Sequence, residues 1–334
     1  MRKIIIGCLI FSCMIYTHLF QANQLAGYEF YKELYPKQVI VEDGTLLLSN
    51  SPETVKEIGI LYQDCIIGSG RFLFHHVNQT DSSEKKLVIV AENRKQNPEI
   101  LRVSKKAVVS PHYHYLKAGE EVLSNYFHNM LEEIYFLNPY EKVVIYDSVD
   151  THWPLQTVQS GMMDLETEGE VKITFAMLER SDSIEQINHL PKLDKDKAPR
   201  GTFKSLSKMQ YVVLPEHTDA YYLIEKDSTG WIQGMDALTQ EKAINYGNYG
   251  IMYKITLMAM ADTEVFICPR GGIFQGIVRW EDGQIRNIKR SHVFKTHKER
   301  ISIGQVKQGE VKTLEYFLPN GSAAPILIGF KVSQ

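Results

Sequence analysis

Four histidines are the side chains in this 334-residue sequence best suited to hold a metal ion. His112 and His114 flank Tyr113, and residues two apart in a strand point to the same face, so both imidazoles could reach one copper or zinc ion. We predict that His75 and His128 complete this site. The alternative is that these histidines are exposed loop residues or packed side chains, because His-x-His pairs often arise by chance.

The same stretch offers a second kind of site, one that binds a glycan through Tyr113 and Tyr115. Arg270, in the string Pro269-Arg-Gly-Gly272, could bind a carboxylate. The competing interpretation makes Arg270 and Arg200, which precedes a similar string, arginines that hold loops together. A basic stretch over residues 286–300 could attract an anionic cell-wall polymer or lipid headgroups, or could form a solvated hairpin.

Linear signatures of nucleophilic and zinc-dependent catalysis are missing from the sequence. It contains no Gly-x-Ser-x-Gly, His-Glu-x-x-His or Cys-x-x-Cys string. The acid pairs Glu120-Glu121 and Glu132-Glu133 are neighbours on a predicted helix, where adjacent residues do not face each other. We therefore expect no catalytic residues and no cofactor, although an acid pair assembled only in the folded chain would leave no linear trace.

Several scattered strings resemble a group of secreted bacterial proteins, most of them of unknown function. Some of these proteins carry the repeat module named after the N-terminal domain of copper amine oxidases, which is not visible here. The resemblance spans most of residues 40–332, and the strings that carry it are Arg71–Asn78, Leu87–Asn93, Arg200–Phe203, Asn245–Tyr253 and Pro269–Gly276.

The enzyme in that module's name can be tested against the residues. Copper amine oxidases make their quinone from the tyrosine of Thr-x-x-Asn-Tyr-Asp/Glu, but here Tyr246 is followed by Gly247 and Lys242 stands at the threonine position. His112 and His114 precede this tyrosine, whereas the copper-binding pair of the oxidases follows it. Amine oxidase activity is therefore not expected.

The first 26 residues predict export. A basic start is followed by an uncharged apolar run, Ile4–Tyr16, whose 13 residues at helical rise cover about 20 Å, short of the roughly 30 Å hydrocarbon core. This pattern is typical of a signal peptide, ending at Ala22 or Ala26, although a lipid anchor at Cys13 or an uncleaved helix stays open. We expect a secreted or surface-associated protein that meets the membrane only through such an N-terminus.

Composition limits the partners of the exported part. The full chain has 37 basic and 40 acidic residues, a net charge of -3, and removal of Arg2 and Lys3 leaves 35 against 40, a net charge of -5. We therefore expect no nucleic-acid partner, because no basic surplus would attract one. Cys65 and Cys268 would remain, either bridged in an oxidising compartment or, as we favour, as buried apolar residues.

After residue 36 the chain consists mainly of short runs of β-branched and aromatic residues separated by turn residues, a pattern that predicts a mainly β protein. We expect two antiparallel sandwiches, immunoglobulin-like or jelly-roll-like, over residues 37–182 and 201–334. Residues 183–200, with two prolines and a charged string, form the predicted linker. One amphipathic helix is predicted over residues 118–134, from an apolar stripe at steps of three and four.

Together these features predict an exported, non-catalytic protein of the cell surface or surrounding matrix. The alternative is a copper, zinc or glycan-binding module that uses the region of His112 and His114.

Overall fold

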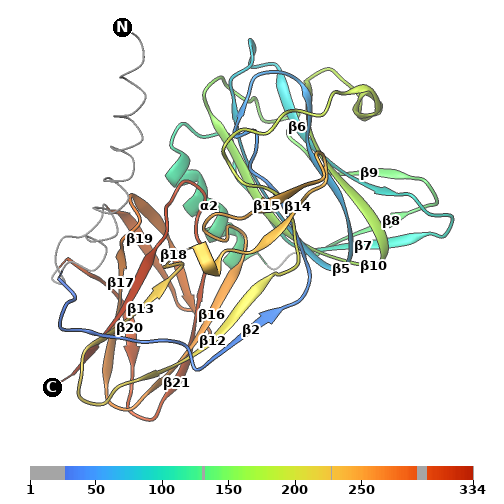
Figure 1. The fold of residues 1–334 in the computed structure, drawn as a ribbon. Coiled ribbons are helices and arrows are strands. Elements are labelled where there is room, and N and C mark those ends of the chain that lie inside the picture. The colour runs from blue at the N-terminus through green and yellow to red at the C-terminus, as the bar shows by residue number, and fades with distance from the viewer. Residues whose placement is uncertain (1–26, 130–131, 227, 292–298, 334) are drawn as a thin grey trace, which may run out of the picture.

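Three β-sheets and one longer helix make up the computed structural model, which describes residues 27–129, 132–226, 228–291 and 299–333 (Figure 1). The predicted signal peptide and residues 292–298 of the basic stretch lie outside these ranges. Strands hold 54% of the residues and helices 7%, which confirms the mainly β prediction. Among the described helices, none is both long enough and apolar enough to cross a membrane.

The largest sheet, which we call the folded sheet, is organised by two long antiparallel neighbours, β5 (Gly59–Asn78) and β10 (Val158–Glu179). The other edge of β10 pairs with β7 (Glu99–Val108) along its first half and with β6 (Lys85–Asn93) along its second. The remaining strands of this sheet are β3 (Thr45–Ser49), β4 (Thr54–Val55), β8 (Glu133–Leu137), β9 (Lys142–Asp147), β11 (Arg200–Phe203), β14 (Gln233–Asp236) and β15 (Glu241–Ile244).

A register shift between Thr167 and Val171 separates the two halves of β10. Irregularities of this kind bend a strand and increase its twist. The two arms close over one apolar core, because Ile89 of β6 and Val103 of β7 belong to the same buried cluster as Phe175 of β10. A single sheet thus encloses its own core.

The other two sheets form a sandwich. One has six strands, and the other has five, and the two share a buried cluster that includes Leu257 and Ile328 from opposite sheets. The six-stranded sheet consists of β19 (Ile285–Ser291), β18 (Phe274–Trp280), β21 (Val311–Tyr316), β16 (Met252–Ala259), β12 (Ser207–Leu214) and β2 (Gln38–Glu42). The five-stranded sheet consists of β1 (Lys32–Glu33), β13 (Ala220–Ile224), β22 (Ile326–Val332), β17 (Thr263–Pro269) and β20 (Ile301–Val306).

The helix α2 (Tyr115–His128) packs between the folded sheet and the sandwich (Figure 1). Its buried stripe includes Val122, Leu123, Tyr126 and Phe127, as the apolar spacing predicts. The predicted end at residue 134 is wrong, because Asn129 is already extended and residues 133–137 form β8. The Asn129 side chain donates to the Lys106 carbonyl, which ties the chain to β7 where the helix stops.

Strands are exchanged across the predicted division of the chain. β2, from the first half, is an edge strand of the sandwich, whereas β11, β14 and β15, from the second half, extend the folded sheet. Two further pairs of neighbours, β3–β5 and β12–β16, are parallel in sheets that we expected to be antiparallel. Each pair lies within one half of the chain, and the segment between its strands makes the crossover that parallel neighbours require.

Residues 183–200 are fastened to the folded sheet and do not link separate halves. The segment begins with the short helix η1 (Ile184–His189), and a second such helix, η2 (Ser228–Gly230), follows later in the chain. Asp196 accepts hydrogen bonds from the Ser51 hydroxyl at 2.8 Å and the Glu53 backbone N–H at 2.7 Å. The predicted linker is corrected accordingly: its prolines and charges belong to a segment with fixed polar partners.

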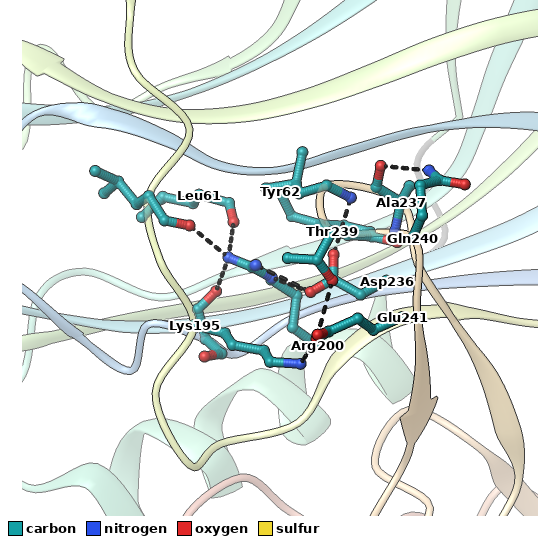
Figure 2. Close-up of polar contacts among 12 residues, drawn as sticks. Leu61, Tyr62, Lys195, Arg200, Asp236, Ala237, Thr239, Gln240 and Glu241 are labelled. Carbon is teal, nitrogen blue, oxygen red and sulfur yellow. Dashed lines mark hydrogen bonds and ion pairs between the residues drawn. The ribbon is translucent and has the colours of Figure 1, made fainter.

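Arg200, at the end of that segment, joins four parts of the folded sheet (Figure 2). Its Nε and Nη2 donate to Asp236 Oδ2 at 3.0 and 2.9 Å, and both side chains are 1% exposed. Its Nη1 donates at 2.9–3.3 Å to the carbonyls of Ser51, Leu61 and Leu193. Arg200 is therefore an arginine that holds loops together, one of the two roles considered for it.

Candidate functional site

The loop before α2 is where the predicted tyrosines and two of the predicted histidines lie. His112 forms an isolated antiparallel bridge with Val158 at the start of β10, with both N–O distances 2.9 Å. After this anchor the chain turns, and α2 begins at Tyr115 with His114 as its N-cap residue. The bridge therefore fixes the starting point of the loop and leaves residues 113–115 at the surface.

A cavity of about 350 Å³ opens at this point, which we call the tyrosine pocket. Two aromatic rings are prominent in it, because Tyr113 is 69% exposed and Tyr115 is 48% exposed. Its lining residues come from the loop, the first turn of α2 and the start of β18, and they are Tyr113, His114, Tyr115, Leu116, Lys117 and Gln275. The pocket thus spans the junction between the helix and the sandwich.

Gln275 is held in place from both ends. Its backbone N–H donates to Ser322 Oγ, and that hydroxyl donates back to the Gln275 carbonyl, each at 3.1 Å. Its side-chain amide donates to Glu120, which also accepts from Lys117 Nζ at 3.1 Å. The amide is therefore oriented before any ligand arrives, and the charge of Lys117 is already compensated.

The position of the Tyr115 ring requires a glycine at residue 321, on the loop opposite it. A Cβ atom at Gly321 would lie 2.6 Å from Tyr115 Cδ2, and the φ angle of 83° also favours glycine there. The loop after β21 can therefore approach the ring closely. Tyr115 has one packed face and one exposed part, whereas Tyr113 is mostly exposed.

These groups suit a neutral ligand rich in hydroxyl groups. Aromatic rings present apolar faces with a polar edge, and a preoriented amide can exchange hydrogen bonds with hydroxyls. The volume lies at the lower end of the range of small-molecule sites, about 300–1,000 Å³. The arrangement resembles neither an ion site nor a deep apolar cavity.

His112 and His114 are neighbours, with ring centroids 5.5 Å apart. His112 Nδ1 already accepts the backbone N–H of His114 at 2.9 Å, so only its other nitrogen could bind a metal. No group of three His, Cys, Asp or Glu side chains suited to a metal ion occurs in the part of the chain that the structure describes. The pair is therefore present without the further ligands that we predicted.

His128 and His75 lie elsewhere. His128 ends α2 while His114 precedes it, so about 20 Å of helix separates them at 1.5 Å per residue. His75 is 3% exposed inside the protein, and burial lowers its pKa to about 3. The predicted four-histidine site is corrected on this point, because the helix length and the burial of β5 keep these two side chains away from the loop.

Arg270 is also outside the tyrosine pocket. It is 1% exposed, and its guanidinium carbon lies 5.7 Å from the centre of the Tyr28 ring. Cys65 and Cys268 carry free thiols and are not bridged to each other. Cys268 is buried beside the Tyr28 hydroxyl, at 2.7 Å, and burial raises its pKa to about 11.

Leu116, Lys117 and Gln275 are the pocket residues that sequence reasoning missed. Lys117 stands next to the predicted tyrosines and could have been included on proximity alone. Gln275 lies in the string Gly272-Ile-Phe-Gln275, 160 positions away from Tyr115, and no spacing links the two. Only the packing of α2 against β18 brings them together.

No family model matches the sequence, and no curated protein matches it.

Proposed function

We propose that this protein is an exported, non-catalytic binding protein that holds a neutral glycan in the tyrosine pocket. The observation that carries the proposal is the pair of exposed rings, Tyr113 and Tyr115, beside the fixed amide of Gln275. Sugar rings offer C–H faces to aromatic side chains and hydroxyls to amides, so each feature of the pocket has a counterpart in the ligand.

The pocket's own chemistry supports binding without turnover. Glycoside hydrolysis generally requires two carboxyl groups placed about 5–10 Å apart across the scissile bond. The described lining residues include no carboxylate, and Glu120, behind Gln275, is held by Lys117. Among these same lining residues, neither a nucleophile with a base nor an acid pair faces the cavity.

Export remains a prediction from the first 26 residues, and the cell surface or surrounding matrix is the location that follows from it. A cell-wall polymer or a surface glycan is then the partner that the pocket would meet. The group of secreted bacterial proteins that the sequence resembles has the same location.

A second candidate function rests on His112 and His114, whose rings lie close enough to share a copper or zinc ion. Two histidine side chains hold such an ion weakly unless water or a bound molecule completes the coordination. Elemental analysis after reconstitution decides it: less than about a tenth of an equivalent of either metal contradicts this function.

The main proposal is tested by measuring binding of the purified chain to immobilised neutral oligosaccharides. The oligosaccharides that bind are then titrated by calorimetry. We expect Tyr113→Ala to weaken binding about tenfold, equivalent to about 1.4 kcal/mol, through loss of the exposed ring. Tyr35→Ala is the matched control, because Tyr35 is 68% exposed and does not line the pocket. Binding that is equally strong in the Tyr113 variant, or no binding to any neutral glycan, contradicts the proposal.

A further inference from the structure

A second cavity, of about 270 Å³, lies on the outer face of the folded sheet beside η1. We call it the lysine pocket, after Lys142, Lys172 and Lys192 among its lining residues. Its floor is formed by four adjacent strands, β5, β10, β6 and β9. It is separate from the tyrosine pocket, and the inference drawn from it does not rest on the proposed function.

Strand register places the charged side chains in one row. Lys172 of β10 is paired with Glu92 of β6, and Glu92 is paired with Lys142 of β9. Directly paired residues point to the same face of a sheet, so the row runs lysine, glutamate, lysine across three strands. Residues distant in the sequence thus form one charged edge of the cavity.

The next row on the same face is uncharged. Thr174 lies two residues after Lys172 in β10. It is paired with Gln63 of β5 on one side and with Val90 of β6 on the other. Alternation along the strands puts this row on the face that carries Lys172 and Glu92. Hydrogen-bonding side chains and an apolar surface therefore lie beside the charged row.

The helix η1 supplies a fixed wall. Ile187 is 6% exposed and packs in a cluster with Val88, Val90 and Leu178 on this face. The segment after η1 is tied to β5, because the Ile60 N–H donates to the Pro191 carbonyl at 2.8 Å and the Leu193 N–H donates to the Ile60 carbonyl at 2.9 Å. The cavity is therefore bounded by a packed element on one side and by the charged row on the other.

Positive charge in the lysine pocket exceeds negative charge. Three lysines line it against one carboxylate, Glu92, whose oxygens lie 3.6 Å from Lys172 Nζ and 4.0 Å from Lys142 Nζ. One carboxylate shared at these distances only partly neutralises the two ammonium groups. Lys142 also donates to Asn188 Oδ1 and lies near the exposed Glu185 carboxylate, and Lys192 adds a third charge at the exposed rim. An anion entering the cavity would therefore meet an excess of positive charge in partly desolvated surroundings.

The basic end of the sandwich provides a contrast. A larger cavity there, of about 440 Å³, is lined by Arg286, Lys307 and Lys312. Lys307 is paired with Asp262 at 3.0 Å and Lys312 with Glu310 at 3.3 Å, so each lysine has its own acid. Both lysines of that cavity thus have separate acids, whereas Lys142 and Lys172 share Glu92, which makes the lysine pocket the stronger anion site.

We propose that the lysine pocket binds a phosphate ester of a polyol. Lysines act as point charges that suit a tetrahedral phosphate, whereas planar carboxylates are best matched by the arginine fork, which is not among the described lining residues. Gln63, Thr174 and the side-chain N–H groups of Asn188, whose Oδ1 accepts from Lys142, can bond to polyol hydroxyls, and the Val90 surface can contact the carbon chain. A small sugar phosphate and a repeating phosphodiester both present the group that the lysines recognise.

Calorimetric titration of the full chain with inorganic phosphate, glycerol 3-phosphate and a short poly(glycerol phosphate) tests the proposal. We expect glycerol 3-phosphate to bind more tightly than phosphate, and binding to weaken as salt is added. Tight binding of the oligomer with weak binding of the monomer identifies a polymer as the source, and equal binding per phosphate identifies a small ester. A carboxylate probe, citrate, that binds as tightly as the phosphate esters overturns the proposal.

Two substitutions in the charged row should act in opposite directions. Lys172→Gln should weaken binding of the ester about fivefold to tenfold, whereas Glu92→Gln removes the competing carboxylate and should tighten it by a similar factor. Lys307→Gln, at the compensated end of the sandwich, is the matched control and should leave binding unchanged. Circular dichroism confirms that each variant is folded.

A uniform loss in all three variants, or failure of Glu92→Gln to tighten binding, overturns the proposal, because either result would indicate diffuse attraction to the surface. Neutral-glycan binding is measured on the same variants. Since none of these residues lines the tyrosine pocket, loss of phosphate binding with intact glycan binding, or the reverse, shows which of the two proposals fails.

Discussion

The folded sheet and the sandwich enclose their cores in different ways. In the sandwich, two sheets face each other, and ion pairs such as Arg279–Glu315 and Arg300–Glu264 keep part of their surface in water. In the folded sheet, one sheet closes over itself, and Arg200–Asp236 lies almost fully inside. The interior of the folded sheet also contains the backbone carbonyls of Ser51, Leu61 and Leu193, which need hydrogen-bond donors there.

Arg200 meets that need, because a guanidinium offers five donors and can bond several carbonyls and a carboxylate at once. Unpaired buried carbonyls would otherwise oppose closure. Each region also contains a buried tryptophan, Trp153 in the folded sheet and Trp280 in the sandwich. Unfolding of the two regions can be followed separately by fluorescence in variants that keep one of these residues and replace the other and Trp231 by Phe.

The largest expected effect is that of Arg200→Met. Removing one partner of a buried pair leaves Asp236 uncompensated and should lower the free energy of unfolding by about 3–5 kcal/mol. Urea unfolding followed by Trp153 fluorescence measures it. Arg200→Lys, which keeps the charge but loses the fork, should give a smaller loss. A loss below about 1 kcal/mol for the methionine variant would contradict the role given to Arg200.

The second-largest expected effect is destabilisation of the folded sheet by acid. Burial lowers the pKa of His75 to about 3 and that of His76 to about 4, against about 6.5 in the unfolded chain. Below pH 6.5 the unfolded chain therefore takes up protons that the folded chain does not, and stability falls as the pH is lowered toward 4. By about pH 5 the loss should be about 2 kcal/mol per histidine.

Unfolding free energy measured from about pH 7.5 to about pH 5 checks this slope. His76 is fixed in its neutral form, donating from Nδ1 to the Pro52 carbonyl and accepting the Ser49 hydroxyl at Nε2. His75 has no hydrogen-bond partner at either ring nitrogen among the residues that the structure describes. His75→Leu should therefore remove about one proton from the pH dependence without a large loss near neutral pH, and an unchanged slope would contradict the assignment.

Gly119→Ala tests the joint between the two regions. A Cβ atom there would lie 2.2 Å from the Asn320 carbonyl oxygen, so α2 and the loop after β21 must separate. The expected net loss is about 1–2 kcal/mol, because overpacking outweighs the gain in helix propensity. Gly230→Ala, whose nearest atom would be 3.7 Å away, is the control. We expect the Trp153 and Trp280 transitions to move apart only in the Gly119 variant.

Arg279→Met should have the smallest effect, which sharpens the contrast with Arg200. Arg279 Nε donates to Glu315 Oε2 at 2.6 Å, but 27% of the arginine side chain is exposed. Pairs that water can reach contribute about 1 kcal/mol or less. The same urea titration, followed by Trp280 fluorescence, measures it, and a loss equal to that of Arg200→Met would remove the distinction between the two regions.

Part of this architecture could be predicted from residue patterns. The short runs of β-branched and aromatic residues indicated a mainly β protein, and the stripe through Val122 and Tyr126 indicated the helix. The helix end was missed because Asn129 is fixed by a distant carbonyl on β7. The linker prediction for residues 183–200 was wrong because prolines and charges look alike in a linker and in a segment that is held by hydrogen bonds, here from Ser51 to Asp196 and from Arg200 to Leu193.

The two pockets also differ in how far the sequence alone could predict them. Tyr113 and Tyr115 lie within one short stretch, so the sequence alone singled them out, and their exposure depends mainly on a local turn before a helix. Glu92, Lys142 and Lys172 are scattered over 80 positions and meet only through strand register. Local propensity acts between neighbours in the chain and determined the strands, the helix and the tyrosine loop. Register and the bend of β10 act between distant segments, so only the tertiary structure decided which strands share a sheet and where the lysines gather.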